Sequence, residues 1–253
     1  MTWQFEVIIT ASAPRDLRAE RLPCGHVNLE TNLRISIRRP GWSLILLAAA
    51  LAAAAIIAVP FVREPVLRAA GWALVLDEPV TRADIIVVSL DSGGAGVLEA
   101  ADLVQSGVAT RVAVFSDPLP GEAVEFIRRK FPDEEWDWSA RQIRQLRWLG
   151  VMDVMQIPKS EIGTEEEGQV LPSWCDRHQF QSVVFVVARD HSRRLRRVLN
   201  RVMKDHPTRV TVRPARYSSF DPDRWWQTRS GIRTGIIELQ KLAIEVVLHP
   251  ALF

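Results

Sequence analysis

An uninterrupted apolar run is the strongest pattern in this chain. Residues 43–62 (SLILLAAALAAAAIIAVPFV) carry no charge, and Pro60 near their end is their only strong helix breaker. A helix of about 20 residues can cross a bilayer while satisfying its own backbone hydrogen bonds. We therefore predict a transmembrane helix over residues 41–62, between a cytoplasmic tail at 1–40 and a juxtamembrane linker helix at 63–78. A helix buried in a soluble core is less favoured, since buried helices of this length usually have a polar face.

Two further features concern the fate and the orientation of this helix. A cleaved signal peptide has a shorter apolar core behind a short basic leader, whereas 42 residues precede this run. Retention is therefore favoured over cleavage. Arg34, Arg38 and Arg39 lie just before the run, while Arg63 and Arg68 follow it. This small excess favours a cytoplasmic N-terminus and an extracytoplasmic domain at the inner membrane, with the reversed topology as the alternative.

Beyond Pro79, short apolar runs alternate with longer amphipathic segments. Runs such as DIIVVSL and SVVFVVA are apolar at consecutive positions and rich in β-branched residues, which is typical of strands buried on both faces of a parallel sheet. Strands are predicted at residues 84–90, 111–116, 154–157, 182–188 and 209–213. Helices are predicted at residues 64–76, 95–106, 121–131, 139–149, 164–178 (interrupted or kinked near Pro172), 192–203 and 231–248. The alternation predicts an α/β domain over residues 79–253, with helices on both faces of a parallel sheet.

Composition narrows the set of partners. The chain has 32 basic and 30 acidic residues and lacks a nucleic-acid-binding motif, so nucleic acid is not an expected partner. Cys24 and Cys175 lie on opposite sides of the predicted membrane helix and are not expected to pair. No Cys/His spacing typical of zinc occurs, and no motif identifies a cofactor. Arg193, Arg197 and Arg201 share a helix face, which is either simply solvated or attracted to lipid headgroups.

The candidate site residues directly follow the predicted strands, where ligands of parallel sheets bind. The first strand leads to Ser89, Gly93 and Gly94. Glycines let the backbone approach a ligand, and the N-terminus of the next helix favours an anion. The turn lacks the GxGxxG fingerprint, however, so an ordinary strand-to-helix turn explains it equally well.

The segments that follow the third and fourth predicted strands contain more residues that can bind a ligand or transfer a proton. Thr164 could cap its helix with Glu167 as the capping-box partner, or Thr164 and Glu166 could face the ligand. The strand at 182–188 leads to His191 and Arg194. Arginine beside a helix N-terminus suits phosphate or carboxylate, and an imidazole with an ordinary pKa of about 6.5 suits acid–base chemistry.

These features together resemble domain-of-unknown-function family 218, which includes the YdcF-like, SanA-like and ElyC-like proteins, over roughly residues 72–247. The features that carry the resemblance are ADIIVV after a membrane segment, Gly150-Val151 before the third strand, Thr164 and Glu166 as a T-x-E element, and His191 and Arg194 as an H-x-x-R element. The resemblance implies a Rossmann-like fold, an N-terminal membrane helix and a role in the bacterial cell envelope. The chain departs from the family at Gly96, where an arginine is expected, and it lacks a clear glutamate before Gly150-Val151.

Two functions are consistent with these patterns. The first is a membrane-anchored envelope protein that binds a small anionic ligand, either nucleotide-like or a lipid phosphate. In it, His191 and Arg194 hold the anion, Thr164 and the turn at 89–94 complete the site, and His191 and Glu166 are the candidate catalytic residues. The second is a non-catalytic interaction module with an eroded ligand cleft, which the missing arginine and glutamate favour.

Overall fold

The computed structural model describes residues 42–250 apart from 117–120, 131–138 and 159–162. The predicted tail at 1–40 lies outside the described residues. The apolar run forms two helices rather than one, α1 (Trp42–Ala58) and α2 (Pro60–Leu74). Pro60 begins α2 because proline has no N–H to donate and restricts the preceding residue, Val59, which is extended with a φ of −104°. Among the described residues, no helix is both long enough and apolar enough to span a membrane.

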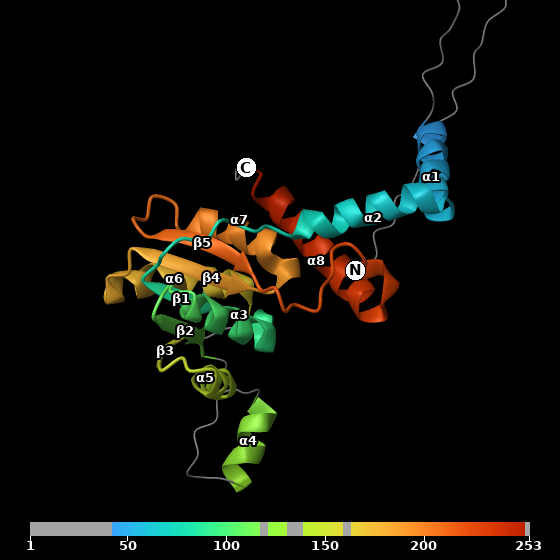
Figure 1. The fold of residues 1–253 in the computed structure, drawn as a ribbon. Coiled ribbons are helices and arrows are strands. Elements are labelled where there is room, and N and C mark those ends of the chain that lie inside the picture. Colours follow the sequence, from blue (N-terminus) through green and yellow to red (C-terminus); the bar gives the residue numbers. More distant parts are fainter. Residues whose placement is uncertain (1–41, 117–120, 131–138, 159–162, 251–253) are drawn as a thin grey trace, which may run out of the picture. The chain divides into compact units, whose positions relative to one another are not determined.

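Five parallel strands form one sheet in the order β3-β2-β1-β4-β5 (Figure 1). Their bounds are β1 (Ile85–Val88), β2 (Arg111–Phe115), β3 (Asp153–Ile157), β4 (Ser182–Val187) and β5 (Arg209–Pro214). All five predicted strands are confirmed, as is the parallel Rossmann-like α/β fold. The chain builds outward from β1 to β3 and then returns to the other side of β1, so the strand order reverses between β1 and β4. This is the point at which open α/β sheets bind their ligands.

Helices cover both faces of the sheet, as predicted: α6 (Thr164–His178) and α7 (Ser192–Val202) pack on one face, and α3 (Gly93–Gln105) and α5 (Ser139–Trp148) on the other. Two further helices are α4 (Gly121–Lys130) and α8 (Arg229–Leu248). Three short 3-10 turns are η1 (Leu90–Ser92), η2 (Arg189–His191) and η3 (Trp225–Gln227). The interruption predicted near Pro172 does not occur, since α6 runs continuously through that residue.

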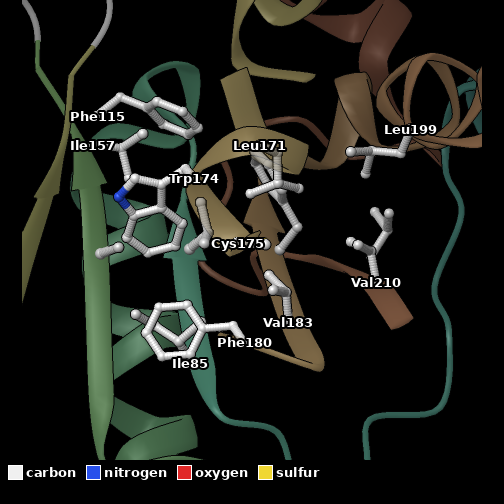
Figure 2. Close-up of a cluster of buried hydrophobic side chains, with 14 of the residues drawn as sticks. Ile85, Phe115, Ile157, Leu171, Trp174, Cys175, Phe180, Val183, Leu199 and Val210 are labelled. Carbon is white, nitrogen blue, oxygen red and sulfur yellow. The ribbon is translucent and has the colours of Figure 1, made fainter. Parts of the chain in front are cut away.

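Alternate residues of the strands supply the two core layers. On one face, Ile85 and Val87 of β1 pack with Leu171 and Trp174 of α6 and with Leu195 of α7 (Figure 2). On the other face, the intervening β1 residues pack with α3 and α5; this second layer includes Ile86, Val88, Val97, Ala100 and Leu146. Every residue of β1 is fully buried, which explains why the strand reads as a continuous apolar run.

A third apolar cluster joins α2 to α8 and to the segment after β5. It contains Leu74, Phe220 and Trp225, with Leu67 and Leu239 packed against them. Glycines permit this close approach: a Cβ at Gly71 would lie 2.3 Å from the Pro222 carbonyl oxygen, and one at Gly235 would lie 2.4 Å from the Trp225 ring. The segment predicted as a juxtamembrane linker is therefore part of the folded domain.

Candidate functional site

A pocket with a volume of about 680 Å³ lies beyond the carboxyl ends of β1 and β4, where the strand order reverses. Its walls come from η1, η2, the segment after β5 and the N-terminal half of α8. The residues that carry polar or charged groups into its lining are Asp91, Ser92, Asp190, His191, Ser218, Ser219, Thr228, Ser230, Arg233, Thr234, Glu238 and Lys241.

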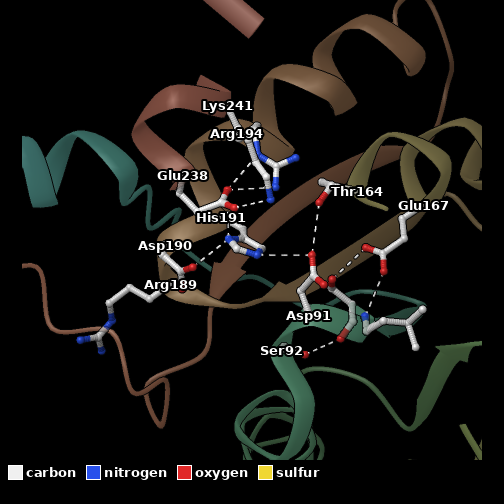
Figure 3. Close-up of polar contacts among 12 residues, drawn as sticks. Asp91, Ser92, Thr164, Glu167, Arg189, Asp190, His191, Arg194, Glu238 and Lys241 are labelled. Atoms are coloured by element: carbon white, nitrogen blue, oxygen red, sulfur yellow. Dashed lines mark hydrogen bonds and ion pairs between the residues drawn. The ribbon is translucent and has the colours of Figure 1, made fainter. Parts of the chain in front are cut away.

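His191 lies at the centre of three carboxylates in this pocket (Figure 3). Its Nε2 is 3.3 Å from Asp91 Oδ2, and its Nδ1 is 2.9 Å from Asp190 Oδ2 and 3.2 Å from Glu238 Oε2. The Nδ1 contacts are ion pairs that lack the geometry of a hydrogen bond. Burial, which leaves the side chain 13% exposed, by itself lowers the pKa of His191. Its contacts with Asp190 and Asp91 outweigh that effect and raise the pKa to about 9, so the imidazole is protonated at neutral pH.

Glu238 of α8 organises the cations on the other side of His191. Its side chain is almost fully buried, and it accepts from Arg194 Nε at 3.0 Å and from Lys241 Nζ at 2.7 Å, in addition to its ion pair with His191. Attraction to these three cations offsets the free-energy cost of removing the Glu238 carboxylate from water. The positive charge of Arg194, which the sequence assigned to a ligand, is thus already paired within the protein.

Asp91 links two predicted site residues that are far apart in sequence. Its Oδ2 accepts from Thr164 Oγ1 at 3.4 Å and lies opposite Nε2 of His191. The pKa of Asp91 is lowered chiefly by its hydrogen bond to His191, so the carboxylate stays ionised. Since its side chain is 41% exposed, Asp91 is also the acidic group of this cluster most open to a ligand.

Ser89 does not line the pocket; it forms buried hydrogen bonds that connect the end of β1 to α6. Ser89 Oγ donates to Glu167 Oε2 at 2.8 Å, and the Leu90 N–H donates to Glu167 Oε1 at 3.0 Å. The capping-box prediction for Thr164 and Glu167 is therefore wrong, because Gly163 is the N-cap and the Glu167 side chain reaches the end of β1 instead. These two hydrogen bonds hold α6 against β1, the strand that precedes Asp91.

The remaining predicted residues do not line the pocket. Glu166 is half-buried on α6, outside the lining set. Gly93 has a φ of 49°, and a Cβ at Gly93 or Gly94 would meet no atom within 4 Å. Gly96, which replaces an expected arginine, has a packing role, because a Cβ there would lie 1.9 Å from Ser92 Oγ. Gly93 thus allows the turn before α3, and Gly96 allows the first turns of α3 to pack against Ser92.

The cations best placed to meet a ligand come from α8, which the sequence did not assign to the site. The side chain of Thr228 caps the helix by accepting from the Gly231 N–H at 3.0 Å. Arg233 is exposed, lines the pocket and makes no ion pair with any described residue. The N-terminus of a long helix carries partial positive charge, so this end of the pocket favours an anion. Arg233 lies 42 residues after His191 in the sequence, which explains why local patterns did not reveal it.

Two pocket residues that the sequence analysis did not select, Glu238 and Asp91, had a weak signal in the sequence. Glu238 shares a helix face with Gly235 and Leu242, so it is a carboxylate within the inward, largely apolar side of α8. Asp91 belongs to the turn after β1, although no motif singled it out. Within the described part of the chain, no group of three or more His, Cys, Asp or Glu residues could hold a metal ion.

Comparison with known proteins adds no family assignment. No protein-family model matches this chain, and no curated protein matches it. The similarity to domain-of-unknown-function family 218 therefore remains a prediction from sequence motifs.

Proposed function

We propose that this is a bacterial cell-envelope protein, attached to the inner membrane through α1, whose pocket binds a small anionic ligand. The ligand is nucleotide-like or a lipid phosphate, since both present a phosphate group. The observation that carries the proposal is the pocket between the ends of β1 and β4, which combines the N-terminus of α8 with the protonated His191.

The anion is expected at the α8 end of the pocket rather than between His191 and Arg194. Three carboxylates already neutralise those two cations, whereas Arg233 has no acidic partner among the described residues. Hydroxyl groups of Ser230 and Thr234 line the same end and can donate to phosphate oxygens. The placement of this unpaired cation and these hydroxyl groups supports phosphate binding by α8, and His191 would then face the rest of the ligand.

The pair formed by His191 and Asp91 also supports proton transfer. The pKa of the imidazole is raised to about 9 and that of the carboxyl is lowered, so an acid and a base stand 3.3 Å apart at neutral pH. His191 would donate a proton to a leaving group, and Asp91 would accept one from water. Glu166 has no role in this scheme because it does not line the pocket.

Membrane attachment rests on the composition and exposure of α1. The helix carries no charge. Its large side chains that are each between 55% and 67% exposed are Leu44, Ile45, Leu46, Leu47 and Leu51. An exposed apolar surface of this kind marks contact with lipid or with another protein. An extracytoplasmic position of the domain remains part of the proposal, supported by the arginines that precede the helix.

Isothermal titration of the full-length protein with inorganic phosphate and with ADP tests the ligand proposal. Arg233→Gln should weaken binding by about ten- to a hundredfold, since a charge-assisted hydrogen bond contributes about 1.5–3 kcal/mol. Arg229→Gln is the matched control, because Arg229 is an exposed arginine at the start of the same helix and does not line the pocket. Equal affinities of both variants and the wild type would contradict the assigned anion site.

The second candidate function is a non-catalytic interaction module. The observation that favours it is the neutralisation of His191 and Arg194 by Asp91, Asp190 and Glu238, which leaves these cations without free charge for a ligand. Native mass spectrometry of the purified protein separates the two functions. A protein that carries no small molecule and binds neither phosphate nor ADP would support the module.

A further inference from the structure

The terminal helix α8 has an apolar stripe that nothing in the described part of the chain covers. Large aliphatic side chains on it are between 39% and 76% exposed; they are Ile232, Ile236, Ile237, Ile244, Val247 and Leu248. Their spacing of three, four and eight residues places most of them along one side of the helix. Isoleucine and valine are only moderate helix formers, so helix propensity does not account for their presence on an exposed face.

The opposite side of α8 is fully occupied by the domain. Leu239 and Leu242 pack in the cluster that includes Leu74 and Trp225, and Gly235 meets the Trp225 ring. The inward face therefore explains the position of the helix without any contribution from the isoleucines. The outer stripe needs a separate explanation, because contiguous exposed apolar surface marks an interaction site.

Charges on α8 are distributed as on a helix that lies at a membrane surface. Both acidic residues, Glu238 and Glu245, are turned inward and form ion pairs with Arg194 and Arg201 respectively. The exposed side of the helix instead carries the cations Arg229, Arg233 and Lys241. Basic residues beside an apolar face are attracted to anionic headgroups, while an unpaired carboxylate on that face would be repelled.

The connection to α1 favours a bilayer over other occupants. Leu67 and Ala70 of α2 pack in the cluster shared with α8. Only Val59 separates α2 from α1, whose exposed apolar side chains carry the proposed membrane attachment. The helix that packs on α2 is therefore connected to α1 through α2 and one further residue.

We propose that the exposed stripe of α8 docks on the lipid bilayer to which α1 attaches the protein. This inference rests on the proposed membrane attachment. Arg233, Ile237 and Lys241 also line the pocket, so docking opens the pocket toward the headgroup layer. In that position the phosphate-bearing ligand is supplied by the lipid rather than by the soluble phase.

Lipid-contact quenching in the full-length protein tests the docking. A single cysteine is introduced as Ile244→Cys or Ile236→Cys in a Cys24→Ser background, and it is labelled with a small fluorophore. Cys175 is fully buried, and burial raises the pKa of its thiol to about 12, so it does not compete for the label. The protein is reconstituted into vesicles of phosphatidylethanolamine and phosphatidylglycerol, with or without brominated acyl chains. Met152→Cys, at an exposed apolar position directly before β3, is the control.

Brominated lipid should quench the label at 244 and at 236 and leave the label at 152 unchanged. Equal quenching at 244 and 152 would overturn the docking. Disulfide-linked dimers of unlabelled Ile244→Cys, without quenching by lipid, would assign the stripe to a second copy of the chain and also overturn it. Flotation with the vesicles separates this inference from the attachment through α1. Protein that floats without quenching at 244 refutes the docking alone, while protein that does not float refutes both.

Discussion

Protonation of His191 should make this protein more stable at neutral pH than at alkaline pH. The imidazole contacts Asp91, Asp190 and Glu238, and these contacts exist only in the folded state. They raise the pKa of His191 from its ordinary value of 6.5 to about 9. A pKa that is raised on folding contributes stability below the unfolded-state pKa, and this contribution is lost as the pH rises through the folded-state pKa.

The size of the effect follows from that difference in pKa. Each tenfold change in proton affinity corresponds to about 1.4 kcal/mol, so a pKa raised from 6.5 to about 9 corresponds to roughly 3 kcal/mol. This contribution should be fully present below pH 6.5 and should decline by about 1.4 kcal/mol for each pH unit above it, until it disappears near pH 9. The neighbouring Asp91, whose pKa is lowered, stays ionised throughout this range.

Urea unfolding of the full-length protein between pH 6 and pH 10 measures the effect, with wild type compared with His191→Asn. The free energy of unfolding of the wild type should fall relative to that of the variant as the pH rises toward about 9. His206→Asn is the control, since the His206 side chain is also 13% exposed and also forms an ion pair, with Asp176. Parallel pH profiles for wild type and His191→Asn would refute the reasoning, because they would show that the carboxylates do not stabilise the protonated imidazole.

Three further changes test the structure around this site. Glu238→Gln removes one anion and should lower the pKa of His191 by about 1 or more, measured by an NMR titration of the imidazole; an unchanged pKa would show that this carboxylate has no influence. Gly96→Ala should lower the free energy of unfolding by about 1–3 kcal/mol through overpacking, whereas Gly94→Ala, which meets no atom within 4 Å, should not destabilise the protein in the same urea assay. Glu99→Gln should destabilise by about 3 kcal/mol, because it removes the negative charge that pairs with Arg213 and Arg216 at a fully buried position and replaces one acceptor oxygen with an NH2 group; a loss below 1 kcal/mol would contradict that role.

The positions of the strands were predictable because the signal for each is local. Consecutive apolar, β-branched residues at 85–88 and 183–187 can be buried on both faces only in the middle of a parallel sheet. The order of the strands was not predictable, because pairing of β1 with β4 joins segments about a hundred residues apart and depends on contacts that no local pattern records. The division of the apolar run at Pro60 was foreseeable from proline chemistry, yet the linker's packing on α8 was not.

The candidate site was predictable only in part, for a related reason. His191 stood out because it follows the clearest strand, and strand ends carry the ligands of such sheets. Thr164 and Arg194 are joined to it through hydrogen bonds to Asp91 and Glu238, which no local pattern indicated. Residue type alone cannot show whether a cation is already paired, because that depends on which carboxylate the fold brings within about 3 Å.

The sequence by itself determined the alternation of buried strands and amphipathic helices, and with it the α/β class and the edge of the sheet at which to look. These features follow from the periodicity of apolar residues, which each segment carries independently of its neighbours. Only the tertiary structure decided that α8 lines the pocket, that Glu238 pairs with His191 and Arg194, and that Arg233 lacks an acidic partner in the described residues. Charge pairing across the fold is a matter of distance in space, and the terminal helix acquires its place beside η2 and α7 only when the chain is folded.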